Sequence, residues 1–228
     1  IYFMADLERS ITLAVTCLDR IIYSKQHSEM VLSESNADVR AVVYSTLRYW
    51  PRLQVISEYL LEKAIKTSAQ KKMQLLLLVG LNQILAGKSA HAVVNAAVNS
   101  AKQIRLSWAK GLINRCLREW LRNTSKIESQ LNNNPVFYYN HPKWLIDAIF
   151  SAWPQQAVDI LTANDQRPPL TLRVNRRKTT IDKYLLQLKS SGKDAQIVSG
   201  LSYALQLHKP CAVESLPGWD EGHCALQD

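Results

Sequence analysis

Apolar residues recur at intervals of three and four positions through the first half of the chain, from Asp6 to about Asn123, where glycine and proline are scarce. This spacing gathers apolar side chains on one face of an α-helix. Polar runs and glycines such as Gly87 interrupt the pattern and separate successive helices. Helices are therefore predicted at about residues 7–22, 37–49, 53–64, 71–85, 90–103 and 107–122.

The pattern changes after the polar run at residues 123–134. Short helices are predicted at about 141–150, 155–162 and 179–190. Residues 170–175 alternate apolar and polar side chains, which is typical of a half-buried strand, and 195–199 and 203–207 are further strand candidates. This order predicts a small α+β domain after an all-helical one. We place the two domains at residues 4–132 and 133–228, beginning at the first methionine, Met4.

Composition is that of a folded protein, with 47% hydrophobic residues and only 7 glycines and 8 prolines in 228 residues. The net charge of +9 favours a polyanionic partner or an anionic membrane surface. Basic residues concentrate at 105–126 and 167–178, whereas the tail at 213–228 contains acidic residues and neither lysine nor arginine. The charge pattern therefore predicts two separate basic surfaces.

Apolar runs are far shorter than the roughly 20 residues that cross a bilayer, so no membrane span is predicted. Asp6, Glu8 and Arg9 do not fit a secretory leader, so we expect a cytoplasmic location. The four cysteines are widely spaced and form no Cys-x-x-Cys pair. Neither a metal site nor a disulfide framework is expected.

The first candidate surface contains Arg115, Arg118 and Arg122, whose spacing of three and four places them on one face of a helix. Guanidinium groups bind phosphates through a planar fork of donors, so this stripe, with Arg105 and Lys110, is a candidate RNA contact. The same spacing is equally typical of a solvated helix face opposite a buried side.

The second candidate surface lies at the end of the first strand. Arg173 and Asn175 fall on the same side of the alternating pattern, and Arg176, Arg177 and Lys178 follow. Such a surface can track a nucleic-acid backbone, although a simple basic loop has the same composition. The tryptophans lying in apolar stripes are predicted to be core residues rather than stacking platforms; they are Trp50, Trp120, Trp144 and Trp153.

A search for catalytic chemistry finds no glycine-rich phosphate loop, no Gly-x-Ser-x-Gly elbow and no His-Glu-x-x-His motif. The five histidines are scattered, and the carboxylates mostly accompany basic residues on predicted helix faces. We therefore predict no catalytic, cofactor-binding or metal-binding residue in this chain.

Several segments resemble known families. The runs LVGLNQIL (78–85), VNAAV (94–98) and GLINRCLR (111–118) resemble the NusB-like helical domain. The runs HPKWL (141–145), ANDQRPPL (163–170) and LRVNR (172–176) resemble the segment that follows this domain in the RsmB (Sun, Fmu) family of 16S rRNA cytosine-C5 methyltransferases. The runs LPGWDEG (216–222) and LQD (226–228) resemble the approach to their catalytic domain.

The resemblance implies an all-α NusB-like helical bundle, then a small α+β RRM-like domain, with the Rossmann-type catalytic domain absent from this chain. In the family, that domain binds S-adenosylmethionine and carries both catalytic cysteines, so we expect this chain to be inactive alone. The resemblance also implies that the chain binds small-subunit 16S rRNA. An alternative is a NusB-like transcription or antitermination module with protein contacts through its helices. A third reading, a complete enzyme of unknown type, requires that a cofactor bind.

Overall fold

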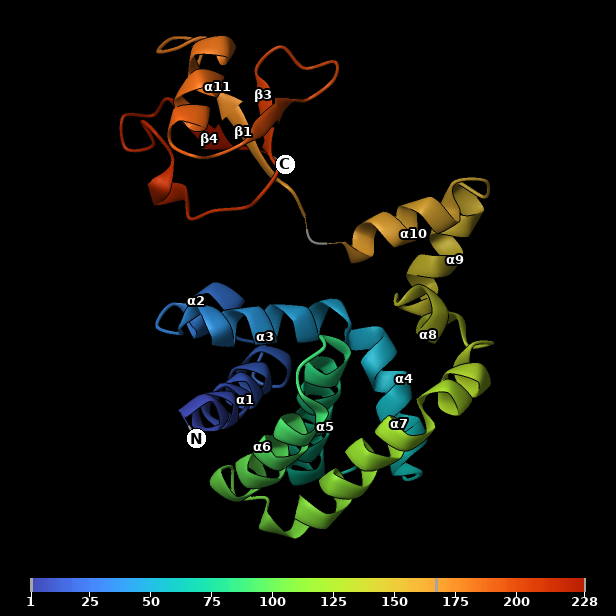
Figure 1. Cartoon of the computed structure of the whole chain (residues 1–228). Coiled ribbons are helices and arrows are strands. Elements are labelled where there is room, and N and C mark those ends of the chain that lie inside the picture. The colour runs from blue at the N-terminus through green and yellow to red at the C-terminus, as the bar shows by residue number, and fades with distance from the viewer. Residues whose placement is uncertain (1, 167, 228) are drawn as a thin grey trace. The chain divides into compact units, whose positions relative to one another are not determined.

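The computed structural model describes residues 2–166 and 168–227 and contains two compact units, which divide between Asp165 and Gln166 (Figure 1). The first, the helical unit, contains ten α-helices among its described residues. They are α1 (Tyr2–Ile22), α2 (Ser28–Leu32), α3 (Ala37–Arg48), α4 (Trp50–Leu61), α5 (Ser68–Leu85), α6 (Ala90–Gln103), α7 (Lys110–Leu131), α8 (Pro135–Tyr139), α9 (Lys143–Ala152) and α10 (Ala157–Asp165), with a 3-10 turn, η1 (Ser107–Ala109), before α7.

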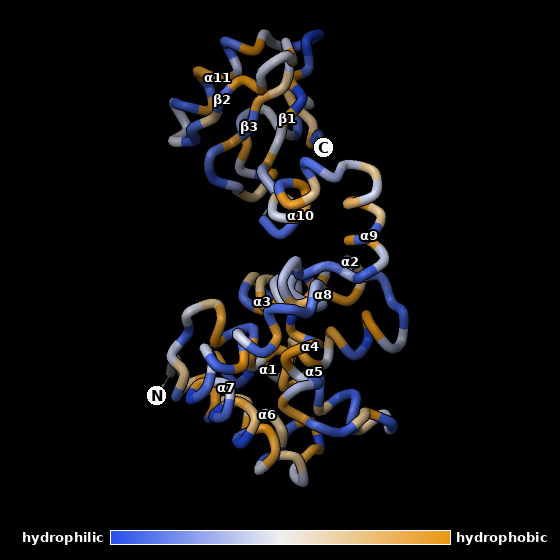
Figure 2. The backbone as a smooth tube through the Cα atoms, turned by 90° about the vertical axis from the view of Figure 1, so that its right-hand side faces the viewer, coloured by the Kyte–Doolittle hydropathy of each residue, from blue (hydrophilic) through white to orange (hydrophobic). Residues whose placement is uncertain are grey.

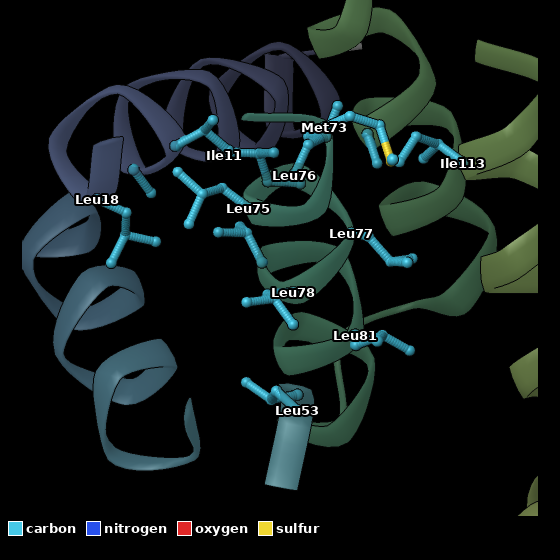
Figure 3. Close-up of a cluster of buried hydrophobic side chains, with 14 of the residues drawn as sticks. Ile11, Leu18, Leu53, Met73, Leu75, Leu76, Leu77, Leu78, Leu81 and Ile113 are labelled. Carbon is cyan, nitrogen blue, oxygen red and sulfur yellow. The ribbon is translucent and has the colours of Figure 1, made fainter. Parts of the chain in front are cut away.

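Helix α5 forms the centre of the helical unit and contacts α1, α3, α4, α6 and α7. The side chains of Leu75, Leu76, Leu77 and Leu78 are all fully buried, so neighbouring helices cover every side of α5. Figure 3 shows these leucines together with Ile11 from α1 and other core side chains. Figure 2 shows the corresponding hydrophobic stretches along α4, α5 and α6. The unbroken apolar run therefore reflects burial on all sides.

Local signals fix several helix ends. Thr67 and Gln70 form a capping box at the start of α5: the Thr67 hydroxyl accepts from the Gln70 backbone N–H, and Gln70 Oε1 accepts from the Thr67 backbone N–H. Pro51 stands in the first turn of α4, where its missing N–H costs nothing, so the chain restarts a helix there. Helix α7 continues to Leu131 through a kink at Asn123, beyond the predicted end, because Ile127 is buried against the core.

Residues 133–165 pack with the helical unit, although the sequence analysis assigned them to the domain at 133–228. Arg52 Nε donates to the Phe137 carbonyl at 2.9 Å, and the Arg52 backbone N–H donates to Asn140 Oδ1 at 3.1 Å. These bonds join positions more than 80 residues apart, so no local pattern encodes them. By packing, the two compact units divide at 165/166, and the domain boundary predicted at 132/133 stays a prediction.

Two of the four tryptophans expected in the core are exposed. Trp120 is 1% exposed and Trp50 packs against the core, as predicted. Trp144 and Trp153 are 71% and 54% exposed, so the core assignment was wrong for both. Helix α9 has only ten residues and buries Ile146 and Ile149 instead, while Trp153 follows its last residue.

The second unit, the sheet unit, consists of β1 (Leu170–Val174), α11 (Ile181–Ser190), β2 (Ala195–Ile197), β3 (Ala204–Leu207), a 3-10 turn, η2 (Val213–Ser215), and β4 (Cys224–Leu226). The strands are ordered β2-β3-β1-β4, and every neighbouring pair is antiparallel. This is the order of a ferredoxin-like β-α-β-β-α-β unit, with η2 where the second helix would stand. The sequence predicted three of the strands and missed β4, which has only three residues.

The alternation predicted for β1 is confirmed. Leu172 and Val174 are buried and pack with Tyr184 and Leu188 of α11. On the opposite face Thr171 pairs with Gln206, whose side chain accepts a hydrogen bond from Gln196 at 3.0 Å. One face of the sheet is thus the core of this unit, and the other is polar.

Within residues 2–166 and 168–227, the strands form this antiparallel sheet alone, and no parallel Rossmann-type sheet is present. In the same residues, none of the helices combines the length and the apolar character that spanning a membrane requires.

Candidate nucleic-acid interface

The predicted stripe of arginines lies on the exposed face of α7. Arg115, Arg118 and Arg122 are all exposed, while Cys116 and Trp120 on the opposite side are buried. The shared face is therefore confirmed. Its contact with RNA stays a prediction.

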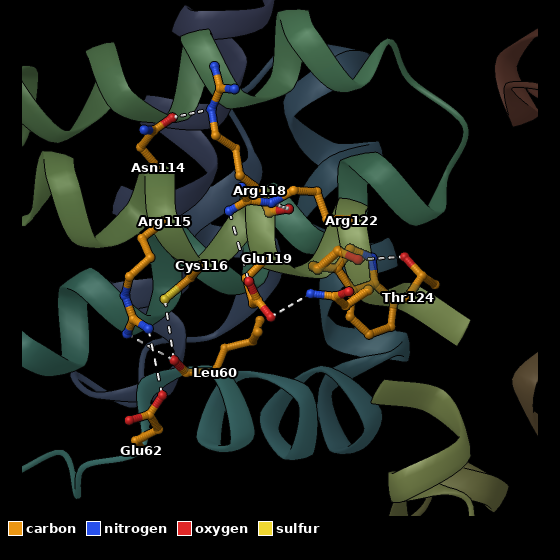
Figure 4. A network of polar contacts seen from close by, with 11 residues as sticks. Leu60, Glu62, Asn114, Arg115, Cys116, Arg118, Glu119, Arg122 and Thr124 are labelled. Atoms are coloured by element: carbon orange, nitrogen blue, oxygen red, sulfur yellow. Dashed lines mark hydrogen bonds and ion pairs between the residues drawn. The ribbon is translucent and has the colours of Figure 1, made fainter. Parts of the chain in front are cut away.

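Arg115 also caps the C-terminal end of helix α4. Its Nη2 donates to the Leu60 carbonyl at 3.2 Å, and its Nη1 lies 3.6 Å from Glu62 Oε1 (Figure 4). The Cys116 thiol donates to the same carbonyl at 3.6 Å. The last carbonyls of a helix have no partner within the helix and carry partial negative charge, so a cation is favourable there. Arg115 therefore has a structural task besides any contact with RNA.

Among the residues that the structure describes, Arg118 and Arg122 make polar contacts only along α7. Arg118 Nε donates to Asn114 Oδ1 at 2.9 Å, and Arg122 Nε donates to the Arg118 carbonyl at 3.3 Å (Figure 4). Arg122 also lies 3.9 Å from Glu119, and both side chains are well exposed, so this pair contributes little to stability. A guanidinium has five N–H donors, and these contacts engage a minority of them. Both arginines can therefore receive an anion.

Arg105 precedes η1 and Lys110 begins α7, so both lie toward the N-terminal end of the helix that bears Arg122. Arg105 is exposed in the bend between α6 and η1, with a left-handed φ of 62°. Arg122 lies twelve positions after Lys110, which corresponds to roughly 18 Å along a helix. That Arg105 and Lys110 share one RNA-binding surface with Arg118 and Arg122 stays a prediction.

The second group belongs to the sheet unit. Arg173 lies on the polar face of β1, and Arg176 and Arg177 are exposed in the turn that follows. Residue 167, where the second basic run of the sequence begins, lies outside the described residues.

Asn175 does not present its side chain as the sequence analysis expected. Strand β1 ends at Val174, and Asn175 Nδ2 donates to the Gly222 carbonyl at 2.9 Å. Its Oδ1 accepts from the Arg177 backbone N–H at 3.1 Å, and Lys178 Nζ donates to the Glu221 carbonyl. Asn175 and Lys178 therefore connect the basic turn to the segment before β4. The alternation of strand β1 does not predict the direction of the Asn175 side chain, because the strand ends at Val174.

Two cysteines are poorly suited to nucleophilic chemistry. Burial raises the pKa of the Cys116 thiol, and burial likewise raises the pKa of the Cys224 thiol. A thiolate is the nucleophilic form, so a raised pKa keeps these groups inert. Among residues 2–166 and 168–227, no group of three or more His, Cys, Asp or Glu side chains could hold a metal.

One aromatic residue of this region was not singled out from the sequence. Trp108 lies in η1, between Arg105 and Lys110 in the chain, and is 57% exposed. The available signal was its position at the start of the helix predicted at 107–122, outside the apolar stripes.

Comparison with known families matches both units. Residues 12–122 match the model of the NusB family, and residues 141–214 match the model of the RsmF/B-like methyltransferase ferredoxin-like domain. The chain joins a NusB-family domain to an RsmF/B-like ferredoxin-like domain. This confirms the family resemblance expected from the sequence. The ferredoxin-like match begins before Asp165, so the family domain includes helices that pack with the helical unit here.

Similar proteins include the ribosomal RNA small subunit methyltransferase B of Pseudomonas syringae pv. tomato, which is 39% identical over 82% of this chain and 42% of its own length. The protein of the same name from Erwinia tasmaniensis is 34% identical over 95% of this chain and 52% of its own length. The chain thus spans about half the length of the curated relatives it matches. The crystal structure of PH0851, 16% identical with a TM-score of 0.60, covers 97% of this chain and 52% of its own and shows a similar fold.

Proposed function

We propose that this chain is the RNA-binding N-terminal part of an S-adenosylmethionine-dependent methyltransferase that modifies cytosine C5 in small-subunit 16S rRNA. The observation that carries the proposal is the alignment of nearly the whole chain with about half of proteins named ribosomal RNA small subunit methyltransferase B. The chain holds the rRNA in position, while S-adenosylmethionine and the catalytic groups belong to the rest of such a protein. A cytoplasmic location follows from a ribosomal RNA substrate.

Charge supports this role. The net charge of +9 concentrates in two runs, and the exposed arginines of both face solvent. Neutralising several phosphates releases condensed counterions, so such surfaces bind RNA strongly at low salt. The buried thiols Cys116 and Cys224 take no part in chemistry.

The ten candidate contacts are not equivalent. Arg118, Arg122, Arg105 and Lys110 form the main strip on the helical unit, and Arg173, Arg176 and Arg177 form the strip on the sheet unit. Arg115, Asn175 and Lys178 already hold neighbouring carbonyls. We propose that these three shape the surfaces and that the other seven contact phosphates.

The test is binding of a 16S rRNA fragment measured across a salt series. We expect wild-type affinity to fall linearly with salt on a double-logarithmic plot, and the Arg118→Glu/Arg122→Glu variant to bind more weakly with a slope smaller by about 0.7–0.9 per lost contact. Lys88→Glu/Lys189→Glu makes the same charge change at exposed lysines outside both strips and serves as the control. Equal losses in both variants, or binding insensitive to salt, would contradict the proposal.

A second candidate function is docking of a protein from the transcription machinery. It is favoured by a groove of about 760 Å³ in the helical unit, whose lining includes the exposed Leu85 and Tyr138. Leu85→Asp would then abolish binding of a transcription-machinery protein to the chain in a pull-down and leave the affinity for RNA unchanged. RNA binding without any such capture would remove this candidate.

A further inference from the structure

Trp108 is exposed, although the turn that carries it is anchored by buried neighbours and backbone hydrogen bonds. Its neighbours Leu106 and Ala109 are buried, and the Ala109 backbone N–H donates to the Leu106 carbonyl at 2.9 Å. The Leu106 N–H in turn donates to the Ala101 carbonyl at 2.7 Å, which fixes the turn to the end of α6. The turn is therefore anchored on both sides of Trp108, while the indole itself is 57% exposed.

A groove of about 370 Å³ adjoins this indole. It is lined by the end of α4 and the segment that follows, from Leu61 to Ile65, by Gln70 and Met73 of α5, and by Trp108, Leu112 and Arg115. Its volume lies within the roughly 300–1,000 Å³ range of sites that bind small molecules. The groove belongs entirely to the helical unit.

Basic residues line the groove and flank Trp108 in the chain. Lys63 and Arg115 line it, and Arg105 and Lys110 flank Trp108 in the chain. The carboxylate of Glu62 also lines the groove, but Arg115 lies 3.6 Å from it and offsets its charge. An anionic, partly aromatic ligand therefore complements this site better than an apolar or a cationic one.

Arg115 connects the groove to the arginine strip. It stands at the rim of the groove, and Arg118 and Arg122 continue from it on the same exposed face of α7. Residues three and four apart on a helix are neighbours, so the strip runs away from Trp108 without a gap. A strand of RNA whose phosphates follow the strip would bring a base to Trp108.

We propose that Trp108 and the 61–65 segment form a subsite for one unpaired nucleobase of the bound RNA. The base stacks on the indole, and Lys63, Arg105 and Lys110 contact the adjoining phosphates. Stacking on aromatic side chains is tolerant of sequence, and it requires a base that is not held in a duplex. The inference rests on the proposed function and specifies which RNA the helical unit prefers: a single-stranded segment rather than a duplex.

The test compares two probes with the full 228-residue chain: a short fluorescein-labelled single-stranded RNA of mixed sequence, and the same strand annealed to its complement. We expect Trp108→Ala to weaken single-strand binding by about fivefold to a hundredfold and to leave duplex binding unchanged. Trp108→Phe keeps a stacking surface and should retain most of the affinity. The salt dependence should not change, because no charge is removed.

Trp144→Ala is the matched control, since Trp144 is an exposed tryptophan on a different helix, α9. Unfolding temperatures of all variants establish that each is folded. Single-strand affinity of Trp108→Ala equal to that of the wild type, or an equal loss for the duplex, would overturn the subsite. If Arg118→Glu/Arg122→Glu still weakens binding in that case, the proposed function survives without the subsite; if the wild type binds neither probe, both proposals fail.

Discussion

Asn140 Nδ2 donates a hydrogen bond to Asp165 Oδ1 at 2.8 Å, joining the turn after α8 to the last residue of α10. The same side chain donates to the Arg48 carbonyl at 3.0 Å and accepts from the Arg52 backbone N–H at 3.1 Å. Asn140 is 2% exposed and adopts a left-handed conformation, with φ of 54°. A single amide therefore connects three parts of the helical unit.

We expect Asn140→Ala to lower the free energy of unfolding by about 2–4 kcal/mol, because buried partners lose their hydrogen bonds and alanine disfavours a positive φ. Urea denaturation followed by circular dichroism measures this change. Asn140→Gly loses the same bonds but accepts the backbone conformation, so it should recover about 1 kcal/mol relative to alanine. Equal stabilities for the two variants would show that the backbone contributes nothing.

Gly80 in α5 marks a close approach to α7. A Cβ atom built there would lie 3.1 Å from both terminal carbons of Leu117, which is itself fully buried. Leu117 has little room to move in the core, so Gly80→Ala should destabilise the protein by about 1–3 kcal/mol despite the better helix propensity of alanine.

Gly111 in α7 supplies the control for that substitution. A Cβ atom at Gly111 meets nothing within 4 Å, so Gly111→Ala should raise the free energy of unfolding by about 0.5–1 kcal/mol. Chemical denaturation of both variants tests the pair. A stabilised Gly80→Ala variant would mean that α5 and α7 separate at little cost.

Asn175 and Arg176 are adjacent residues with different expected roles. Asn175→Ala should destabilise the sheet unit by about 1–2 kcal/mol, because the Gly222 carbonyl and the Arg177 N–H lose their partner. Arg176→Ala removes an exposed side chain, so it should change stability by less than about 0.5 kcal/mol and weaken RNA binding. Thermal unfolding and RNA titration of both variants separate the roles. Loss of RNA affinity in Asn175→Ala at unchanged stability would contradict this assignment.

Alkaline pH should weaken the sheet unit. Burial, together with the hydrogen bond to Cys224, raises the pKa of Tyr184 above its ordinary value of 10.0, and burial raises the pKa of Cys224 above 9.0. A group with a raised pKa in the folded state contributes stability that is complete below its unfolded-state pKa and is lost as pH rises toward the folded-state value. The urea midpoint should therefore fall progressively above about pH 9.

Tyr184→Phe tests the origin of that decrease. Tyr184 Oη donates to the Pro217 carbonyl at 3.0 Å, so the variant should be less stable at neutral pH by about 1 kcal/mol. Without the phenol, its urea midpoint should change less than that of the wild type above pH 10. A parallel decline in both proteins would assign the alkaline effect to other groups.

Local patterns in the sequence determined most of the secondary structure and the faces of its elements. Helix α6 spans Ala90–Gln103 as predicted, β1 buries alternate side chains, and Arg115, Arg118 and Arg122 share one exposed face. Periods of 3.6 and 2 residues follow from backbone geometry alone, so they can be recognised without knowing the partners. The family resemblance likewise rests on contiguous segments.

Only the tertiary structure decided which of these side chains are free to contact a ligand and which already bind other parts of the protein. The hydrogen bonds of Arg52 and Asn140 place α8–α10 with the helical unit. Strand β4 has only three residues and is stabilised by pairing with Leu172–Val174 of β1. Arg115 and Asn175 are engaged by carbonyls that lie 55 and 47 positions away in the chain. Such contacts depend on which distant backbone groups the fold brings together, and no periodicity near either residue records that.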